Sequence, residues 1–260
     1  MVSPQIHTIL NSFSPVTLEE MEALRLMNRM DTKFVFSAGL LPEFLHSLAP
    51  DYKILEIGQR RDSIYNTKYL DTEDLLFYIQ HVRGKLARHK IRFRKYESTG
   101  ATFLEIKKKT NRNRTVKWRT ENCFVNDILD DPATQFIKKH LPYNSSPLQV
   151  KLENKFTRIT LAGFETKERI TLDYCMSFSS SNGALIELPY LAIAELKSEG
   201  FPSWSPFVLV AKKFGIKPTG FSKYCMGNVL LKDLPKKNVL KQKIILLNKI
   251  ENEYSKLNVS

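Results

Sequence analysis

The sequence predicts an α+β fold, in which an antiparallel β-barrel with a basic lumen (a tunnel) is flanked by helices. Two observations carry this prediction. Several segments alternate apolar and polar residues, which is the pattern of strands that bury one face. Arginine and lysine recur on the polar face of one such segment after another. The polar faces of an ordinary sandwich point outward and seldom hold so many charges of one sign, whereas a closed barrel turns them toward one anionic ligand.

Residues 87–96 show the alternation clearly. A strand here places Arg88, Lys90, Arg92 and Arg94 on one face and apolar side chains on the other. Like charges that share a face repel one another, so they need either open solvent or a polyanion. Taken alone, this strand is explained equally well by simple solvation.

Neighbouring segments repeat the pattern. Residues 102–109 and 114–119 are typical of a hairpin, and one face of it carries Glu105, Lys107, Lys109, Lys117 and Arg119. Strands predicted over residues 148–161 and 166–174 contribute Arg158 and Arg169. Because the same charge recurs on separate strands, a bound polyanion explains it better than solvation does.

One predicted strand, residues 191–197, is apolar except for Glu195 and Lys197. Buried charges are costly unless they are paired or bound to a metal. Glu195 therefore forms either a structural ion pair with a basic side chain or a site for a divalent cation that bridges phosphate oxygens.

Helices are predicted before, between and after the strands. Thr17 and Glu20 form a capping box for a helix that reaches residue 27 or 30, and Pro42 suits the first turn of a helix over residues 37–48. Acidic residues predict another helix start within residues 71–78. The remaining predicted helices cover residues 121–140, 205–214 and 240–257. The remaining predicted strands cover residues 29–36, 52–57 and 62–70.

The composition limits the kinds of binding partner and the cellular compartment that we expect. The 260 residues carry a formal net charge of +13, which favours a phosphate-rich partner: nucleic acid, nucleotide, polyphosphate or an anionic membrane. Cys123, Cys175 and Cys225 lie far apart, which argues against a zinc site or a disulfide framework and fits a reducing compartment. The N-terminus lacks the pattern of a secretory signal, and no apolar run approaches the ~18 residues of a membrane span. We therefore expect a cytoplasmic protein.

We expect one folded unit with helical additions at both ends. Residues 29–228 form the tunnel domain, residues 1–28 an N-terminal helical segment packed on it, and residues 229–260 a C-terminal amphipathic helix. The lysine-rich face of that last helix could make weak contact with an anionic membrane, although packing on the domain is favoured.

A set of short basic motifs carries a resemblance to a known family. In chain order they are RMDTKF, IRFRKY, FLEIKKK, VKWR, FTRITL, RITLDY, AIAELKS and FSKYCMG. Their number and order over residues 29–227 resemble the polyphosphate polymerase (VTC) domain of the triphosphate tunnel metalloenzymes, which are related to the CYTH group. The resemblance implies an antiparallel β tunnel and manganese-dependent transfer of the γ-phosphate of ATP to a growing polyphosphate chain.

The resemblance also implies roles for individual residues. The catalytic residues that would hold and neutralise phosphates are Arg92, Arg94, Lys107, Lys117, Arg158, Arg169 and Lys223. The substrate-binding residues, matched to the family or added because they share the same faces, are Lys33, Lys109, Arg119, Lys197 and Ser222. Glu195 matches the metal-binding glutamate, with Mn²⁺ or Mg²⁺ as the cofactor. The expected partners are ATP and polyphosphate rather than nucleic acid.

The chain departs from the family pattern in two places. Phe156 replaces the tyrosine that stands two residues before the arginine at Arg158, so a hydroxyl contact to phosphate is lost. The superfamily's ExExK motif appears as Arg29-x-Asp31-x-Lys33, with one acid missing, which weakens a triphosphatase interpretation and agrees better with the polymerase branch. Three functions remain open: a polymerase, a tunnel-fold triphosphatase or similar hydrolase, and a non-catalytic module that binds polyphosphate or nucleic acid.

Overall fold

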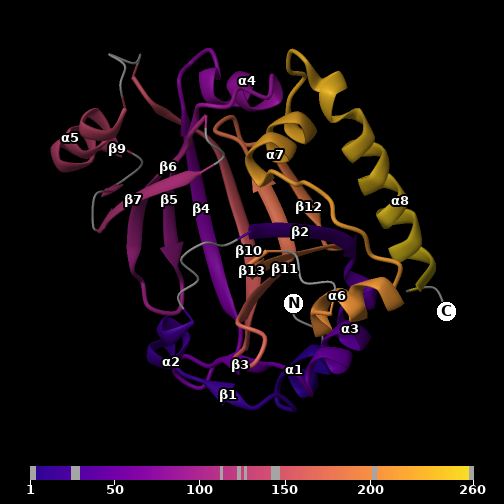
Figure 1. Ribbon diagram of the computed structural model, residues 1–260. Coiled ribbons are helices and arrows are strands. Elements are labelled where there is room, and N and C mark those ends of the chain that lie inside the picture. The colour runs from indigo at the N-terminus through magenta and orange to yellow at the C-terminus, as the bar shows by residue number, and fades with distance from the viewer. Residues whose placement is uncertain are drawn as a thin grey trace.

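One large sheet organises the computed structural model, which describes residues 4–24, 30–111, 114–121, 124–125, 128–141, 147–200 and 204–257. Its main path has the strand order β2-β13-β11-β10-β4-β5-β6-β7 (Figure 1). In that order the strands are β2 (Met30–Ser37), β13 (Leu191–Ser198), β11 (Glu168–Ser179), β10 (Gln149–Gly163), β4 (Ser63–Asp71), β5 (Arg88–Tyr96), β6 (Thr102–Lys109) and β7 (Thr115–Glu121).

Short strands complete the sheet. They are β1 (Pro15–Val16), β3 (Lys53–Leu55) and β12 (Leu185–Leu188), while β8 (Phe124–Val125) and β9 (Ile128–Leu129) form a separate pair. β1 runs parallel to β3, and the other described pairings are antiparallel. The predicted α+β class with an antiparallel sheet is therefore confirmed.

The sheet differs from the prediction in one respect: within the described residues it does not close into a barrel. β2 and β7 stand at the two ends of the path and do not pair with each other. The segment before Ser222 covers the outer edge of β2 instead. Pro218 forms a bridge with Phe34, and the Thr219 N–H donates to the carbonyl of Lys33 over 2.6 Å. A covered edge is not available to a closing strand.

The open sheet nevertheless curls around one of its faces, which we call the inner face. β2 and β5 are separated by four strands, so a flat sheet would hold them about 24 Å apart. Lys90 on β5 nevertheless donates to Ser222 Oγ over 3.1 Å, and Thr219, three residues before Ser222, donates its N–H to the carbonyl of Lys33 on β2. One short segment thus contacts both strands, which requires them to approach each other across the inner face.

Apolar residues of the opposite, outer face form a core beneath helices. One cluster joins this face to α1 (Pro4–Leu10), α3 (Leu41–Leu48) and α6 (Pro206–Lys213), with sheet members that include Phe34, Ile159, Ile170 and Leu196. Another places α5 (Asp131–His140) against β5 and β6, where its sheet members are Ile91, Phe93, Leu104 and Ile106. The alternation predicted from the sequence therefore separates a packed face from a charged one.

Three helices cover one end of the inner face: α4 (Leu76–Val82), α7 (Lys223–Leu231) and α8 (Lys241–Leu257). Figure 1 shows α4 and α7 near the top ends of the long strands, while α8 runs down the right-hand side of the sheet. Leu247 and Ile250 of α8 are buried in this cluster, which confirms that its apolar stripe packs on the domain. Contact of its lysine-rich face with lipid stays a prediction, as do the domain boundaries.

Helix starts were predicted with mixed success. The capping box is confirmed: Thr17 N–H donates to Glu20 Oε2 over 2.8 Å, and Glu20 N–H donates to Thr17 Oγ over 3.3 Å. The helix, α2 (Leu18–Ala23), is shorter than predicted because the backbone leaves helical geometry at Leu24. Arg29, the first residue of the ExExK-like motif, lies outside the described residues.

Two helix predictions were wrong in detail. Asp71 belongs to β4 rather than to a helix, and its carboxylate accepts the N–H groups of Phe77 and Tyr78, each over 2.9 Å, so α4 starts only at Leu76. Residues 121–140 are not mainly helical, since β8 and β9 precede α5. Asp130 caps α5 by accepting the Ala133 N–H over 2.8 Å. α7 had no predicted counterpart.

No helix in the described part of the chain combines the length and the apolar character that a bilayer crossing needs. The cytoplasmic localisation stays a prediction.

The carboxylate of Asp71 also anchors α7, because it accepts the hydroxyl of Tyr224. Asp71 is fully buried. We expect Tyr224→Phe to lower the free energy of unfolding by about 1.5–3 kcal/mol, since a hydrogen bond to a buried charged group is lost. Urea unfolding followed by circular dichroism measures this.

Tyr78→Phe is the matched control for that measurement. Tyr78 is equally buried, but its hydroxyl has no hydrogen-bond partner among the described residues. Its removal should therefore change the free energy of unfolding little. Equal losses in the two variants would contradict the anchoring role of Tyr224.

Candidate functional site

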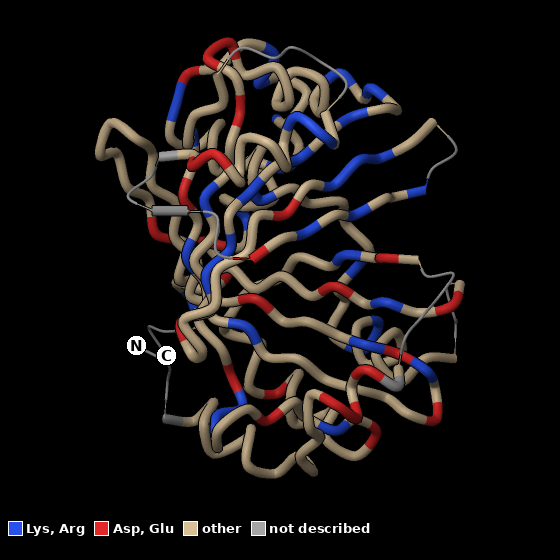
Figure 2. The backbone as a smooth tube through the Cα atoms, turned by 90° about the vertical axis from the view of Figure 1, so that its left-hand side faces the viewer, with Lys and Arg blue, Asp and Glu red and all other residues tan. Residues whose placement is uncertain are grey.

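The inner face repeats one arrangement, in which a carboxylate lies between two basic side chains. The carboxylates are Glu195, Asp173 and Glu105. Each can neutralise only one of its two partners, so every such group carries a net positive charge when both partners are protonated. Figure 2 shows Lys and Arg recurring on neighbouring strands, with Asp and Glu interspersed. We call these three groups the Glu195, Asp173 and Glu105 units.

The Glu195 unit joins the edge strand β2 to its neighbour β13. Lys33 Nζ lies 2.7 Å from Glu195 Oε2, and Lys197 Nζ contacts Oε1. Burial alone would raise the pKa of Glu195, but Lys197 and Lys33 outweigh it and hold the pKa well below its usual range. Glu195 is therefore ionised, with both oxygens engaged by ammonium groups.

The Asp173 unit lies at the centre of the sheet. Arg158 grips both carboxylate oxygens, with Nε 2.6 Å from Oδ1 and Nη2 2.8 Å from Oδ2, and Lys223 contacts Oδ2 as well. Lys223 comes from the first residue of α7, and its Nζ lies 3.3 Å from the ring centroid of Phe156. Burial lowers the pKa of Lys223 to about 7, and the attraction of Asp173 offsets only part of that effect.

The Glu105 unit joins β5 and β6. Arg92 Nη2 lies 2.6 Å from Glu105 Oε2, and Arg94 Nη1 lies 3.9 Å from the same oxygen. Burial would raise the pKa of Glu105, but Arg92, Arg94 and Lys107 hold it at about 2. The pKa of Lys107 is held well below its usual range, by Arg92 first, then by burial and by Lys117. Such repulsion among cations would be relieved by a bound anion.

The N-terminus of α7 brings two predicted residues to this face. Ser222 caps the helix, and its hydroxyl also accepts a hydrogen bond from Lys90 Nζ over 3.1 Å. Lys223 follows directly and enters the Asp173 unit. The partial positive charge of a helix N-terminus adds to the potential of the neighbouring ammonium groups.

Four further predicted residues share the same face. Arg169 is in register with Lys197, and Lys117 with Lys107. Arg119 holds its guanidinium 4.5 Å above the centroid of the Phe103 ring. Lys109 lies at the far end of β6, in register with Arg88. The structure thus gathers the predicted cations on one face and sets Lys109 and Arg119 toward its rim.

A divalent cation would meet carboxylates that are already paired with basic side chains. Within the described residues no three Asp, Glu, His or Cys side chains come together as metal ligands. Glu195 is the predicted metal ligand, and it can offer its oxygens only when Lys33 or Lys197 turns away from it. Mg²⁺ in phosphate-handling sites is commonly held by one or two carboxylates together with substrate oxygens and water. The residues therefore fit a metal that arrives with phosphate.

Sequence reasoning missed several members of this face. Asp173 and Glu105 were seen to alternate with basic residues, and that pattern could have marked them as the partners of the arginines. Lys90 was placed on the correct face without a site role. The aromatic rings of Tyr65 and Phe103 carried no signal, because aromatic residues in strands more often belong to the core.

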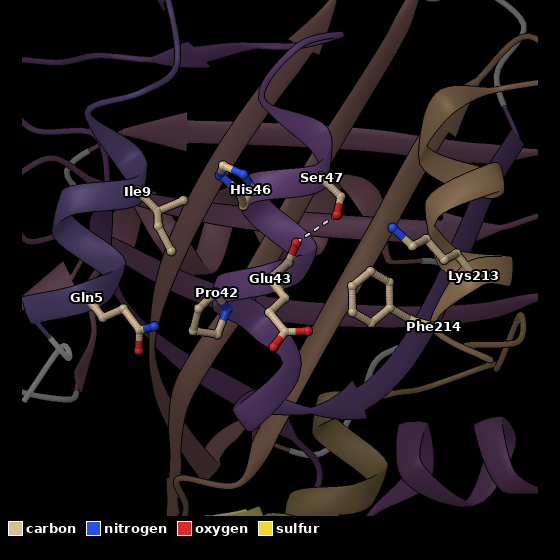
Figure 3. A pocket seen from close by; sticks show the side chains of 8 residues that line it. All are labelled: Gln5, Ile9, Pro42, Glu43, His46, Ser47, Lys213 and Phe214. Carbon is tan, nitrogen blue, oxygen red and sulfur yellow. Dashed lines mark hydrogen bonds between the residues drawn. The ribbon is translucent and has the colours of Figure 1, made fainter.

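A separate hollow lies on the outer side of the molecule, between α1, α3 and α6 (Figure 3). Its lining residues are Gln5, Ile9, Pro42, Glu43, His46, Ser47, Lys213 and Phe214. Ser47 donates its hydroxyl to the Glu43 carbonyl of the preceding turn over 2.9 Å. Because the lining comes from helices that cover the outer face, the hollow is no part of the charged site.

Comparison with known proteins gave a clear match at the level of the family. The family model described as the VTC domain matches residues 28–232. A search of curated proteins gave no match.

The solved structures that match this chain share little sequence identity with it. A protein from Hippeastrum, named after adenylyl cyclase and described as having a dominant triphosphatase activity, is 13% identical; the match covers 80% of this chain and 99% of that one, with a TM-score of 0.46. A protein from Vibrio parahaemolyticus, also named after adenylate cyclase, is 13% identical over 84% and 99% of the two chains, with a TM-score of 0.44. The PH1819 protein from Pyrococcus horikoshii is 13% identical over 75% and 96%, with a TM-score of 0.41.

Proposed function

Because the chain belongs to the VTC domain family, we propose that it is an ATP-dependent polyphosphate polymerase, which transfers the γ-phosphate of ATP to a growing polyphosphate chain on its inner face. One observation carries the proposal: three carboxylates on that face are each shared by two cations, so the face holds a surplus of positive charge in half-buried positions. A chain of phosphates is the ligand whose repeating charge suits such a surface.

The reaction needs positioning and charge neutralisation more than covalent chemistry. An oxygen of the terminal chain phosphate attacks the γ-phosphorus and forms a new P–O bond, while the bond from that phosphorus to the β–γ bridging oxygen breaks and ADP leaves. Arg94 and Arg158 present forked donors to the phosphates. A bound phosphate raises the pKa of Lys223 and so preserves its positive charge beside the group that is transferred.

Glu195 is the residue that would hold the divalent cation, with Mn²⁺ as the metal we propose and Mg²⁺ as the alternative. Such a metal neutralises charge on the phosphate oxygens. Lys33 and Lys197, which share Glu195, are placed to bind the same phosphates. The Glu195 unit would then exchange an internal ion pair for contacts to the substrate.

Hydrolysis is the competing function, and two of the carboxylates give it little support. A carboxylate that activates water must be able to accept a proton. Arg92, Arg94 and Lys107 hold the pKa of Glu105 at about 2 against the opposing effect of burial, and Arg158 and Lys223 do the same for Asp173. Both groups are weak bases, whereas chain transfer needs no such base, because the attacking phosphate is already ionised.

The proposal is tested with purified protein, ATP and Mn²⁺, by following acid-stable polymer length on a gel and release of ADP. We expect long chains from the wild type and none from Arg94→Ala. Lys95→Ala is the matched control, since Lys95 follows Arg94 in β5, points to the opposite face and pairs with Glu97 over 3.2 Å. It should leave chain formation unchanged.

Other outcomes identify the alternatives. Release of inorganic phosphate from ATP without chains would favour the triphosphatase. Tight RNA or DNA binding that survives Glu195→Gln, without nucleotide turnover, would favour a non-catalytic module.

A further inference from the structure

A row of aromatic rings crosses the inner face beside the charged units. Phe156 of β10 stacks on Tyr65 of β4, with centroids 5.3 Å apart and planes 13° from parallel. Tyr65 contacts Tyr96 of β5 at 4.9 Å, and Tyr96 meets Phe103 of β6 edge-on at 5.6 Å. The row therefore runs over four adjacent strands toward the turn between β5 and β6.

The two ends of this aromatic row differ in how exposed their rings are. Phe156 is 2% exposed, and cations cover its end: Lys223 lies over Phe156, and Arg158 over both Phe156 and Tyr65. Tyr96 and Phe103 are only half-buried, and neither belongs to the described hydrophobic core clusters. Accessible ring surface is thus available at the β5–β6 end.

A cation completes that accessible end. The guanidinium of Arg119, itself exposed, lies 4.5 Å from the centroid of Phe103. Aromatic faces and guanidinium planes both stack on nucleobases, whatever the base. A chain of phosphates carries no ring, so it has no use for this surface.

We propose that Tyr96, Phe103 and Arg119 bind the base of the nucleoside triphosphate, an inference that rests on the proposed function. Arg94 precedes Tyr96 by two residues on the same face of β5, a separation of about 7 Å. A base on the rings therefore leaves the phosphates to follow β5 from Arg94 toward Arg92. The aromatic end then distinguishes a nucleotide from a polyphosphate chain and sets the direction in which the triphosphate lies.

Binding to the full chain tests this directly by calorimetry. The two probes are the non-hydrolysable β,γ-imido analogue of ATP and inorganic tripolyphosphate, which has the phosphates without the base. We expect Phe103→Ala to weaken binding of the ATP analogue about tenfold, in line with the loss of one stacked base, and to leave tripolyphosphate binding unchanged. Unchanged tripolyphosphate binding also shows that the variant is folded.

Two variants serve as controls. Phe164→Ala removes another exposed phenyl ring beneath a cation, since Lys53 Nζ lies 5.3 Å from its centroid, but outside the inner face. It should bind both probes like the wild type. Tyr96→Phe keeps the ring and should keep the affinity for the ATP analogue.

The possible failures are distinguishable. If the wild type binds neither probe, the proposed function falls and takes this inference with it. If the wild type binds both and Phe103→Ala weakens both equally, or neither, the stacking role is overturned while the polymerase proposal stands. Tighter binding of a short single-stranded oligonucleotide than of the ATP analogue would assign the rings to nucleic acid and overturn the inference as well.

Discussion

Arg158→Ala is expected to reduce the rate of chain formation at least ~100-fold, the scale set by loss of one preorganised donor to a developing charge. Arg158 combines an ion pair with contacts to two aromatic rings. It grips both oxygens of Asp173, lies 4.9 Å from the centroid of Tyr65 and 5.3 Å from that of Phe156, and has an 18% exposed side chain. Its removal leaves Asp173 with Lys223 as its remaining ion-pair partner.

The effect should appear in both substrate binding and turnover. Without Arg158, Lys223 is drawn more fully to Asp173, so two cations are lost to the phosphate rather than one. Initial rates at several ATP concentrations, together with tripolyphosphate affinity, measure the change. Arg158→Lys should restore only part of the activity, because an ammonium group cannot make the forked contact.

Arg61→Ala separates this role from stability. Arg61 has the same 18% exposure, pairs with Glu56 over 2.8 Å and donates to the carbonyls of Leu10 and Phe13, all away from the inner face. We expect its loss to lower the melting temperature while the folded fraction keeps its activity. An Arg158→Ala variant that polymerises at the wild-type rate would remove the Asp173 unit from the mechanism.

Strand alternation allowed much of this face to be predicted from the sequence. Charges at every second position of β5 and β6 must share a face whatever the rest of the fold does, and the register of Arg92 with Glu105 follows from a short hairpin. The placement of Glu195 and Lys197 on one side of β13 follows from the same rule. Local geometry was sufficient for these residues.

Contacts between distant segments could not be predicted in this way. The segment of residues 219–222 contacts both Lys33 on β2 and Lys90 on β5 only because the sheet curls, and curling depends on twist and packing along the whole path. Lys223 reaches Asp173 because α7 packs on the sheet. The short apolar run after Ser222 lacks the helical spacing of apolar residues that would have predicted this helix. Asp71 looked like a helix start because its carboxylate does cap a helix, but it does so from the end of a neighbouring strand.

Gly227→Ala is expected to destabilise the protein and to displace the N-terminus of α7 from the site. A Cβ at this position would lie 2.5 Å from Phe178 Cδ1 and 2.7 Å from Leu152 Cδ2. Alanine improves intrinsic helix stability by about 1 kcal/mol relative to glycine. Overpacking of a tight core costs about 1–3 kcal/mol or more, and Phe178 and Leu152 are fully buried. The clash therefore outweighs the gain.

α7 can relieve this clash by moving away from β10 and β11, and that movement displaces Ser222 and Lys223. A misplacement of about 1 Å can cost ~100-fold in rate, so activity should fall more than the loss of folded protein explains. Urea unfolding and the polymerase assay on the same preparation separate the two effects. Gly220→Ala is the matched control, because the nearest atom to its added Cβ is the flexible Lys243 Nζ at 3.9 Å.

A second substitution tests the cause of the displacement. Phe178→Leu in the Gly227→Ala background shortens the side chain that the new methyl group meets, so α7 can return to the sheet. We expect the double variant to recover activity relative to Gly227→Ala even where stability stays below the wild type, since Phe178→Leu alone removes buried contacts. If Gly227 had a purely structural role, activity would not recover without full recovery of stability. Such a recovery would show that the packing of α7 on the sheet determines the position of Lys223.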